Sequence, residues 1–151
     1  MSQWTHLAGI IRLDNLLRRV AFNAPAEDLV MKILLKDAPV GSEGGCSFYF
    51  HKWPEAKNYD EKDHTNIHEG STYWADVIIS ADLRDVGDNE EDIEKITQWF
   101  MDLAQKLWKS KLLIRQAVLE IEVEYKYWEI VNLKDQQDNK WIITRIPWRE
   151  N

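Results

Sequence analysis

Residues 88–124 read DNEEDIEKITQWFMDLAQKLWKSKLLIRQAVLEIEVE and carry two different hydrophobic periods, one after the other. Over 88–109, apolar side chains recur every three or four positions, as on the buried face of an amphipathic helix. Asp88 or Asn89 is suited to cap this helix, since an acidic residue follows three positions later. The first part of the segment therefore predicts a long, half-buried helix.

The second part, QAVLEIEVE over 116–124, alternates between apolar and polar residues. A period of two places one set of side chains on each face of a strand, so this segment predicts a strand with one buried face. A helix that leads into such a strand is typical of a fold in which helices pack on one face of a sheet.

The same patterns extend outward from this segment toward the N-terminus. Residues 3–13 alternate and predict a first strand. Residues 25–36 follow an opening proline with two acids and an apolar stripe, and they predict a helix. Residues 46–53, before Pro54, and 73–83 predict two more strands.

The order of these elements is β-α-β-β-α-β, which predicts an α+β, ferredoxin-like sandwich with an antiparallel sheet. Right-handed crossovers place both helices on the same face of that sheet. Residues 125–151 contain YKYWEIVNL and KWIITRIPW joined by a turn-rich segment, and they predict an appended C-terminal β-hairpin. We expect one domain over 1–151, with its core in 1–124.

Composition narrows the class of protein. A formal net charge of -7 argues against a partner that is a nucleic-acid backbone. The single cysteine, Cys46, excludes an intramolecular disulfide and a Cys-rich zinc site. The first residues have no signal-peptide pattern, and the apolar runs are far shorter than the ~18 residues that span a membrane. We expect a cytoplasmic protein without membrane contact, whose eight tryptophans are buried in its core or in an interface.

The stretch GSEGG, residues 41–45, comes directly before the second predicted strand, residues 46–53. A phosphate-binding glycine loop leads from a strand into a helix N-terminus, whereas this loop leaves a helix and enters a strand. It also places the anion Glu43 at its centre. We interpret Gly41, Ser42, Glu43 and Gly44 as a turn, and keep a binding lip of converging N–H groups as the alternative.

Alternation assigns an unusual set of side chains to the sheet face opposite the helices. This set includes Trp4, His6, Ile10, Arg12, Tyr49, His51, Trp74, Asp76 and Ile78. If His6, Asp76 and His51 lie in one row, they have the chemistry to bind a metal or to transfer protons. The alternative is that another subunit covers this face. We assign no catalytic residue, metal or cofactor from this pattern.

Other candidate residues have simpler interpretations. His64 and His68 have a chelating spacing, but their segment has no apolar face and no HExxH glutamate. The acid-rich stretch 82–95 is suited to stabilising the start of a helix. Arg84 lies between acids and either closes an ion pair or orients a ligand. Cys46 has no base assigned to it and is interpreted as structural.

Several segments resemble a set of small phage-encoded proteins. The segments are WTHLAGIIRLD, GSEGG, ADLRDVGDNEEDIEKITQWF and IRQAVLEIEVE, and the patterns are W-T-H-x-x-G-x-I-R-x-D, G-S-E-G and D-L-R-D. The resemblance covers most of the first 124 residues. This chain departs from it at Ala81, where a glycine is usual, and in the hairpin after Tyr125.

The resemblance implies a phage origin and a role in the cytoplasm of the infected bacterium, but no established activity. The residues that belong to the shared pattern are Trp4, His6, Arg12, Gly41, Ser42, Glu43, Gly44, Leu83, Arg84 and Asp85. Within this set, we expect Arg84 to pair with Glu43 and so to hold the glycine loop in place.

These observations favour a non-catalytic, self-associating binding protein that acts on a host component, as an inhibitor of antiviral defence. One mode is sequestration of a small signalling nucleotide between subunits, with Arg12, Arg84, Trp4 and Trp74 as stacking and phosphate-binding partners. The other mode covers a host protein with the acidic stretch 82–95.

Two rival hypotheses belong to other classes. A metal-assisted hydrolase or phosphoesterase would use His6, His51 and Asp76. A virion or assembly component would need no site at all, and its function would be carried by its surfaces.

Overall fold

The computed structural model describes residues 2–14, 27–52, 73–110, 112–124, 126–134 and 139–146. The elements are β1 (Trp4–Asp14), α2 (Glu27–Leu35), β2 (Cys46–Lys52), β3 (Tyr73–Arg84), α3 (Glu90–Lys109), β4 (Leu113–Val123), β5 (Lys126–Lys134) and β6 (Asn139–Ile146). The expectation of an α+β chain with an antiparallel sheet and two helices is confirmed.

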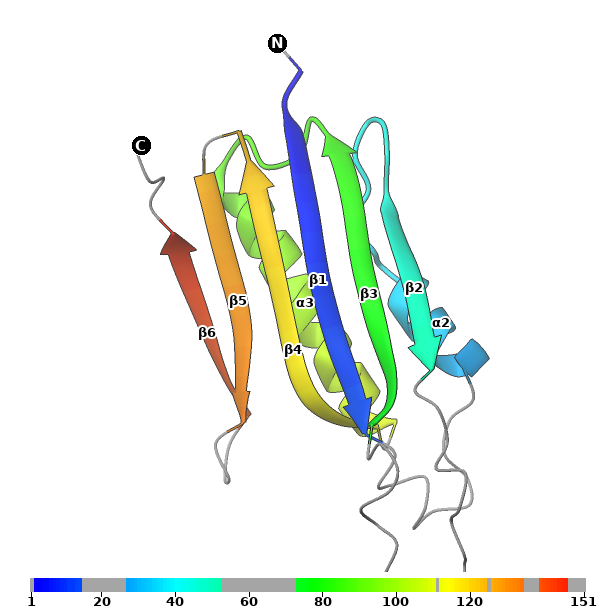
Figure 1. The fold of residues 1–151 in the computed structure, drawn as a ribbon. Helices are drawn as coiled ribbons and strands as arrows, with labels where there is room; N and C mark the ends of the chain where they lie inside the picture. Colours follow the sequence, from blue (N-terminus) through cyan, green and yellow to red (C-terminus); the bar gives the residue numbers. More distant parts are fainter. Residues whose placement is uncertain are drawn as a thin grey trace, which may run out of the picture.

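The strands form one six-stranded sheet in the order β2-β3-β1-β4-β5-β6 (Figure 1). Every neighbouring pair is antiparallel. The C-terminal hairpin pairs with β4 and extends the sheet, because the chain reverses through Glu124 at φ 53° and sets Lys126 opposite Val123. Figure 1 shows α2 and α3 on the same face of the sheet.

The core lies between the sheet and the two helices. Odd-numbered side chains of β1 and β3 point into it, while even-numbered ones lie on the other face, so the predicted alternation is confirmed. The members of β1 and β3 in the core include Leu7, Ile11, Leu13, Val77, Ile79 and Leu83. Helix α3 adds Ile96, Phe100, Leu103 and Leu107, which recur at helical spacing and are all buried.

Helix α3 begins as the sequence predicts. The side chain of Asn89 accepts a hydrogen bond from the backbone N–H of Asp92 at 3.0 Å. Asp92 in turn accepts one from the backbone N–H of Gly87 at 3.2 Å. Acidic residues fill the first turn and lysines the last, in the orientation that the helix dipole favours.

Strand β4 begins at Leu113, three residues before the predicted strand. The sequence pattern misses these first residues because the pairing of β1 with β4 shifts register between Arg12 and Leu13. A shift of this kind breaks the period of two, so the first residues of the strand do not alternate with the rest.

Among the described residues, no helix has the length and apolar character needed to cross a membrane.

Candidate functional site

The glycine loop, residues 40–45, is bonded to the end of β3. The N–H of Ser42 donates to the carbonyl of Arg84 at 2.9 Å, and the N–H of Arg84 donates to the carbonyl of Glu43 at 3.0 Å. The N–H of Gly41 donates to the carbonyl of Gly44 at 3.3 Å. Because Gly41 and Ser42 direct their N–H groups at the protein's own carbonyls, the geometry favours the interpretation as a turn over that as a phosphate cradle.

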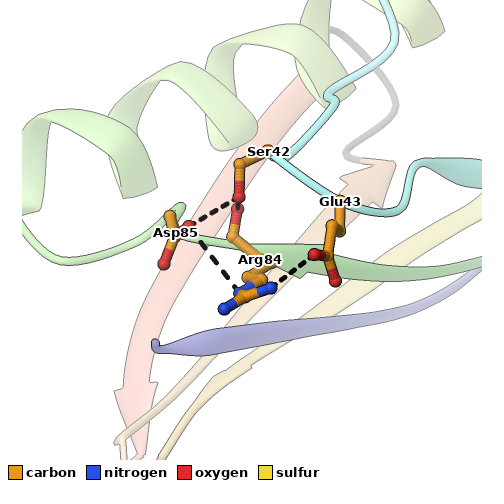
Figure 2. Close-up of polar contacts among 4 residues, drawn as sticks. All are labelled: Ser42, Glu43, Arg84 and Asp85. Carbon is orange, nitrogen blue, oxygen red and sulfur yellow. Dashed lines mark hydrogen bonds and ion pairs between the residues drawn. The ribbon is translucent and has the colours of Figure 1, made fainter. Parts of the chain in front are cut away.

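Side chains reinforce the same junction, as Figure 2 shows. The guanidinium of Arg84 pairs with Glu43, and its Nε lies 3.8 Å from a carboxylate oxygen of Asp85. The hydroxyl of Ser42 donates to Asp85 at 2.5 Å. The expected pair between Arg84 and Glu43 is therefore confirmed, and the charge of Arg84 is balanced within the loop.

The face of the sheet without helices, called here the helix-free face, carries most of the predicted site residues. Trp4 is 38% exposed and Tyr49 is 63% exposed. The residues placed on this face by their strand positions are Trp4, His6, Arg12, Tyr49, His51 and Asp76. Trp74 lies in β3, but its side chain is outside the part of the chain that the structure describes.

The predicted row of His6, Asp76 and His51 is wrong. Pairing between β1 and β3 sets His6 opposite Asp82, whereas Asp76 lies opposite Arg12 and His51. His6 and Arg12 are six residues apart on an extended strand, which separates them by roughly 20 Å. Among the described residues, no group of three His, Cys, Asp or Glu side chains is arranged to hold a metal ion.

The polar residues instead form two separate clusters. At one end of the face, Nε of Arg12 donates to Asp76 at 3.0 Å, and Asp76 is only 5% exposed. At the other end, the His6 ring contacts Asp82. Neither arginine of the predicted nucleotide site thus offers an unbalanced charge, since each pairs with at least one carboxylate.

Near the second cluster, the Tyr127 hydroxyl donates to Glu122 at 2.9 Å. This hydrogen bond to a carboxylate favours the protonated phenol and so raises the pKa of Tyr127 above its usual value. Trp4 lies opposite Arg84 at this end, whereas Tyr49 lies opposite Ile78. The two aromatic side chains therefore do not share one site.

A groove between the first half of α3 and β5 has a volume of about 640 Å³. Its apolar lining includes Ile93, Met101 and Trp128, and its lining carboxylates include Glu90 and Glu94. Trp128 lies opposite the buried Ile121 of β4, which places it on the helix side of the sheet. We call this feature the α3–β5 groove.

Sequence reasoning missed the α3–β5 groove because its two walls come from α3 and from the C-terminal hairpin. The sequence predicts the hairpin only as an appendage and does not place it relative to the helix. The alternation of Tyr127, Trp128, Glu129 and Ile130 contains the signal that Trp128 faces the core side. That signal predicts a groove residue only when β5 is known to lie beside β4, and alternation does not reveal which strands are neighbours.

Cys46 is partly buried, and its thiol donates to the carbonyl of Pro39 at 3.4 Å. Burial raises the pKa of this thiol to about 11. An exposed cysteine has a pKa of about 8.5, so at about pH 8 the reactive thiolate of Cys46 is scarcer by more than roughly 100-fold. This supports the structural interpretation of Cys46.

We therefore expect iodoacetamide to alkylate Cys46 very slowly at neutral pH and faster as the pH rises toward 11. Mass spectrometry of the intact chain over time measures the rate. The matched control is Leu35→Cys in a Cys46→Ser background, since Leu35 is 59% exposed on α2. Equal rates for the two cysteines at neutral pH would show that burial does not protect Cys46.

His64 and His68, the pair with a chelating spacing, lie outside the described residues.

Comparisons of the chain with protein-family models, with curated proteins and with solved structures found no match. Of the features described above, the α3–β5 groove is the one that combines a measurable volume with an aromatic ring and several carboxylates.

Proposed function

We propose that this chain is a non-catalytic binding protein that receives a basic, partly apolar segment of another protein in the α3–β5 groove. The observation that carries this proposal is the composition of the groove wall, where Glu90 and Glu94 stand beside Trp128 and Met101. A volume of about 640 Å³ is in the range of protein ligand sites and suits a few side chains of a partner.

The side chains that line the groove suit a partner segment with both apolar and basic residues. Ile93, Met101 and Trp128 provide apolar surface for a leucine or phenylalanine side chain. Glu90 and Glu94 are exposed and negative, while the groove's lysine, Lys95, already pairs with Glu91 at 2.8 Å. A lysine or arginine of the partner gains charge complementarity with these acids, and a net charge of -7 steers it toward the surface.

The ion pairs on the sheet favour a protein partner over a small nucleotide. A phosphate site needs cations that are free to pair with the ligand. Here Arg12 pairs with Asp76, and Arg84 pairs with Glu43 and Asp85. Of the two modes considered for a binding protein, covering a host protein with acidic surface is therefore the better supported.

The biological setting in this proposal comes from the resemblance to phage-encoded proteins. It places the chain in the cytoplasm of an infected bacterium, as an inhibitor of a host defence protein.

We also propose a ferredoxin-like core over 1–124. Its support is the strand order β2-β3-β1-β4, with β1 between its two antiparallel neighbours and both helices on one face.

The proposal is tested with a fluorescently labelled, amphipathic Lys/Leu peptide as the probe and fluorescence anisotropy as the measurement. We expect the chain to bind this peptide with an affinity that falls as salt is added, because exposed charge pairs are screened. Reversing one groove charge, in Glu94→Lys, is expected to weaken binding by roughly 10-fold. A Glu/Leu peptide of the same length is expected not to bind.

Asp28→Lys is the matched control, because Asp28 is also exposed but lies on α2, which contributes no residue to the groove lining. It makes the same change in net charge and is expected to alter the affinity by less than about 2-fold. Equal weakening by both variants would mean that the peptide responds to overall charge, and the groove would lose its role. Hydrolysis of a phosphodiester by the chain with zinc, lost in His6→Ala, would instead establish the enzyme hypothesis.

A further inference from the structure

The register of the sheet assembles an apolar row across the helix-free face. Tyr49, Ile78, Ile10, Val118 and Val131 lie opposite one another in turn, on β2, β3, β1, β4 and β5. Tyr49 is 63% exposed and Ile78 is 42% exposed, and the other three are partly exposed. The row crosses five adjacent strands, and at about 4.8 Å per strand it is roughly 19 Å long.

Such a row differs from isolated apolar residues on a surface, which need no explanation. Its members come from five strands and form one continuous stripe, with charged and small residues on both sides. This pattern of an apolar centre within a polar rim is typical of a protein–protein interface. Figure 1 shows that neither α2 nor α3 covers this face.

We propose that the helix-free face is the contact surface of a homodimer, and that its occupant is a second copy of this chain. Six strands of about nine residues give the face an area of roughly 800 to 900 Å². A stable interface buries about 800 Å² on each partner, so one face of this size is sufficient. Two such sheets stack about 10 Å apart, with their apolar rows facing each other.

The charges beside the row fit a two-fold axis that runs along it. This axis sets each strand against the same strand of the second copy, in the opposite direction. Glu120, on one side of the row, then lies opposite Gln116 of the other copy, whose amide is able to donate to it. Ser47 lies opposite His51 in the same way. In the two rows next to the axis, no described acid faces another acid.

Sedimentation velocity of the full chain at micromolar concentration tests the proposal. We expect a species of twice the mass of the chain. Ile78→Arg places a guanidinium within the apolar row, beside its central residue Ile10, in both copies and is expected to raise the dimer dissociation constant by roughly 30-fold or more. Leu35→Arg is the control, since Leu35 is an exposed leucine on α2, and it is expected to leave the dimer intact.

Cross-linking gives a second readout that does not depend on a disruptive variant. The proposed axis brings the two Ile10 positions close together, so Ile10→Cys in a Cys46→Ser background should be linked by a short bismaleimide. Leu35→Cys in the same background should react with maleimide without forming a linked dimer. A monomeric wild-type chain, an Ile78→Arg dimer of unchanged stability, or a failure of Ile10→Cys to cross-link would each overturn the proposal.

The proposal is independent of the α3–β5 groove, which lies on the helix side of the sheet. A chain that binds the Lys/Leu peptide but sediments as a monomer would retain its proposed function and lose this inference. A chain that dimerises but does not bind the peptide would retain this inference and lose its proposed function.

Discussion

Phe100→Ala is expected to lower the free energy of unfolding by about 3 to 5 kcal/mol, the range typical of a fully buried phenylalanine. Phe100 lies on α3 with an exposure of 0%, and among the described residues it is the largest of the fully buried side chains. Its ring lies 6.4 Å from that of Trp99, measured between centroids. Truncation removes these contacts and leaves a cavity between α3 and the sheet.

Urea denaturation of the two proteins, followed by circular dichroism, measures this difference. The matched control is Trp108→Ala, which removes another aromatic ring from the same helix. Trp108 is 47% exposed, so its truncation is expected to cost less than about 1 kcal/mol. If both variants lose the same stability, α3 is not held to the sheet through Phe100, and the proposed core is wrong.

The buried side of α3 was predictable from sequence because it depends on local periodicity alone. Apolar residues at helical spacing between Ile93 and Leu107 determine which face is buried, whatever lies against it. The strands follow the same logic at a period of two. The cap at Asn89 and the pair between Arg84 and Glu43 were also accessible, since each joins complementary groups at a chain reversal or beside a loop.

Register was not accessible from the sequence, and register decides what the helix-free face contains. Sliding β3 by an even number of residues keeps every side chain on its predicted face but changes its neighbours. His6 therefore remained on the expected face while its partner became Asp82 in place of Asp76. The same uncertainty concealed the apolar row, because Tyr49 and Val118 belong to strands that are far apart in sequence.

The α3–β5 groove was inaccessible for a related reason. Trp128 becomes a groove residue only because β5 continues the sheet beyond the helix, and that depends on the pairing of β5 with β4. An appended hairpin and a sheet extension have the same alternation in sequence. They differ in the turn at Glu124, whose positive φ allows the chain to return directly beside β4.

Gly44→Ala is expected to lower the free energy of unfolding by about 2 to 4 kcal/mol, through two costs at one position. Gly44 has a φ of 81°, a region that L residues with a side chain rarely adopt. A Cβ on Gly44 would also lie 1.9 Å from the carbonyl oxygen of Asp82, which is backbone and has no rotamer to change. The glycine loop must therefore move away from β3.

Movement of the loop breaks the bonds that join it to β3, so the effect should be visible locally as well as in overall stability. The hydrogen bonds at stake run from the N–H of Ser42 to Arg84 and from the N–H of Arg84 to Glu43. Hydrogen exchange measured by mass spectrometry should therefore show faster exchange in peptides that contain Ser42 and Arg84. Peptides from the centre of α3 should keep their protection, because the core remains intact.

Gly45→Ala is the neighbouring control, since it adds the same methyl group to the same loop. The nearest atom to a Cβ on Gly45 is Cγ1 of Val40 at 3.7 Å, which is an ordinary contact. We expect this variant to change stability by less than about 1 kcal/mol and to leave exchange at Ser42 and Arg84 unaltered. Equal losses in the two variants would mean that the loop tolerates no added bulk at all. The close approach of Gly44 to β3 would then not explain why position 44 needs a glycine.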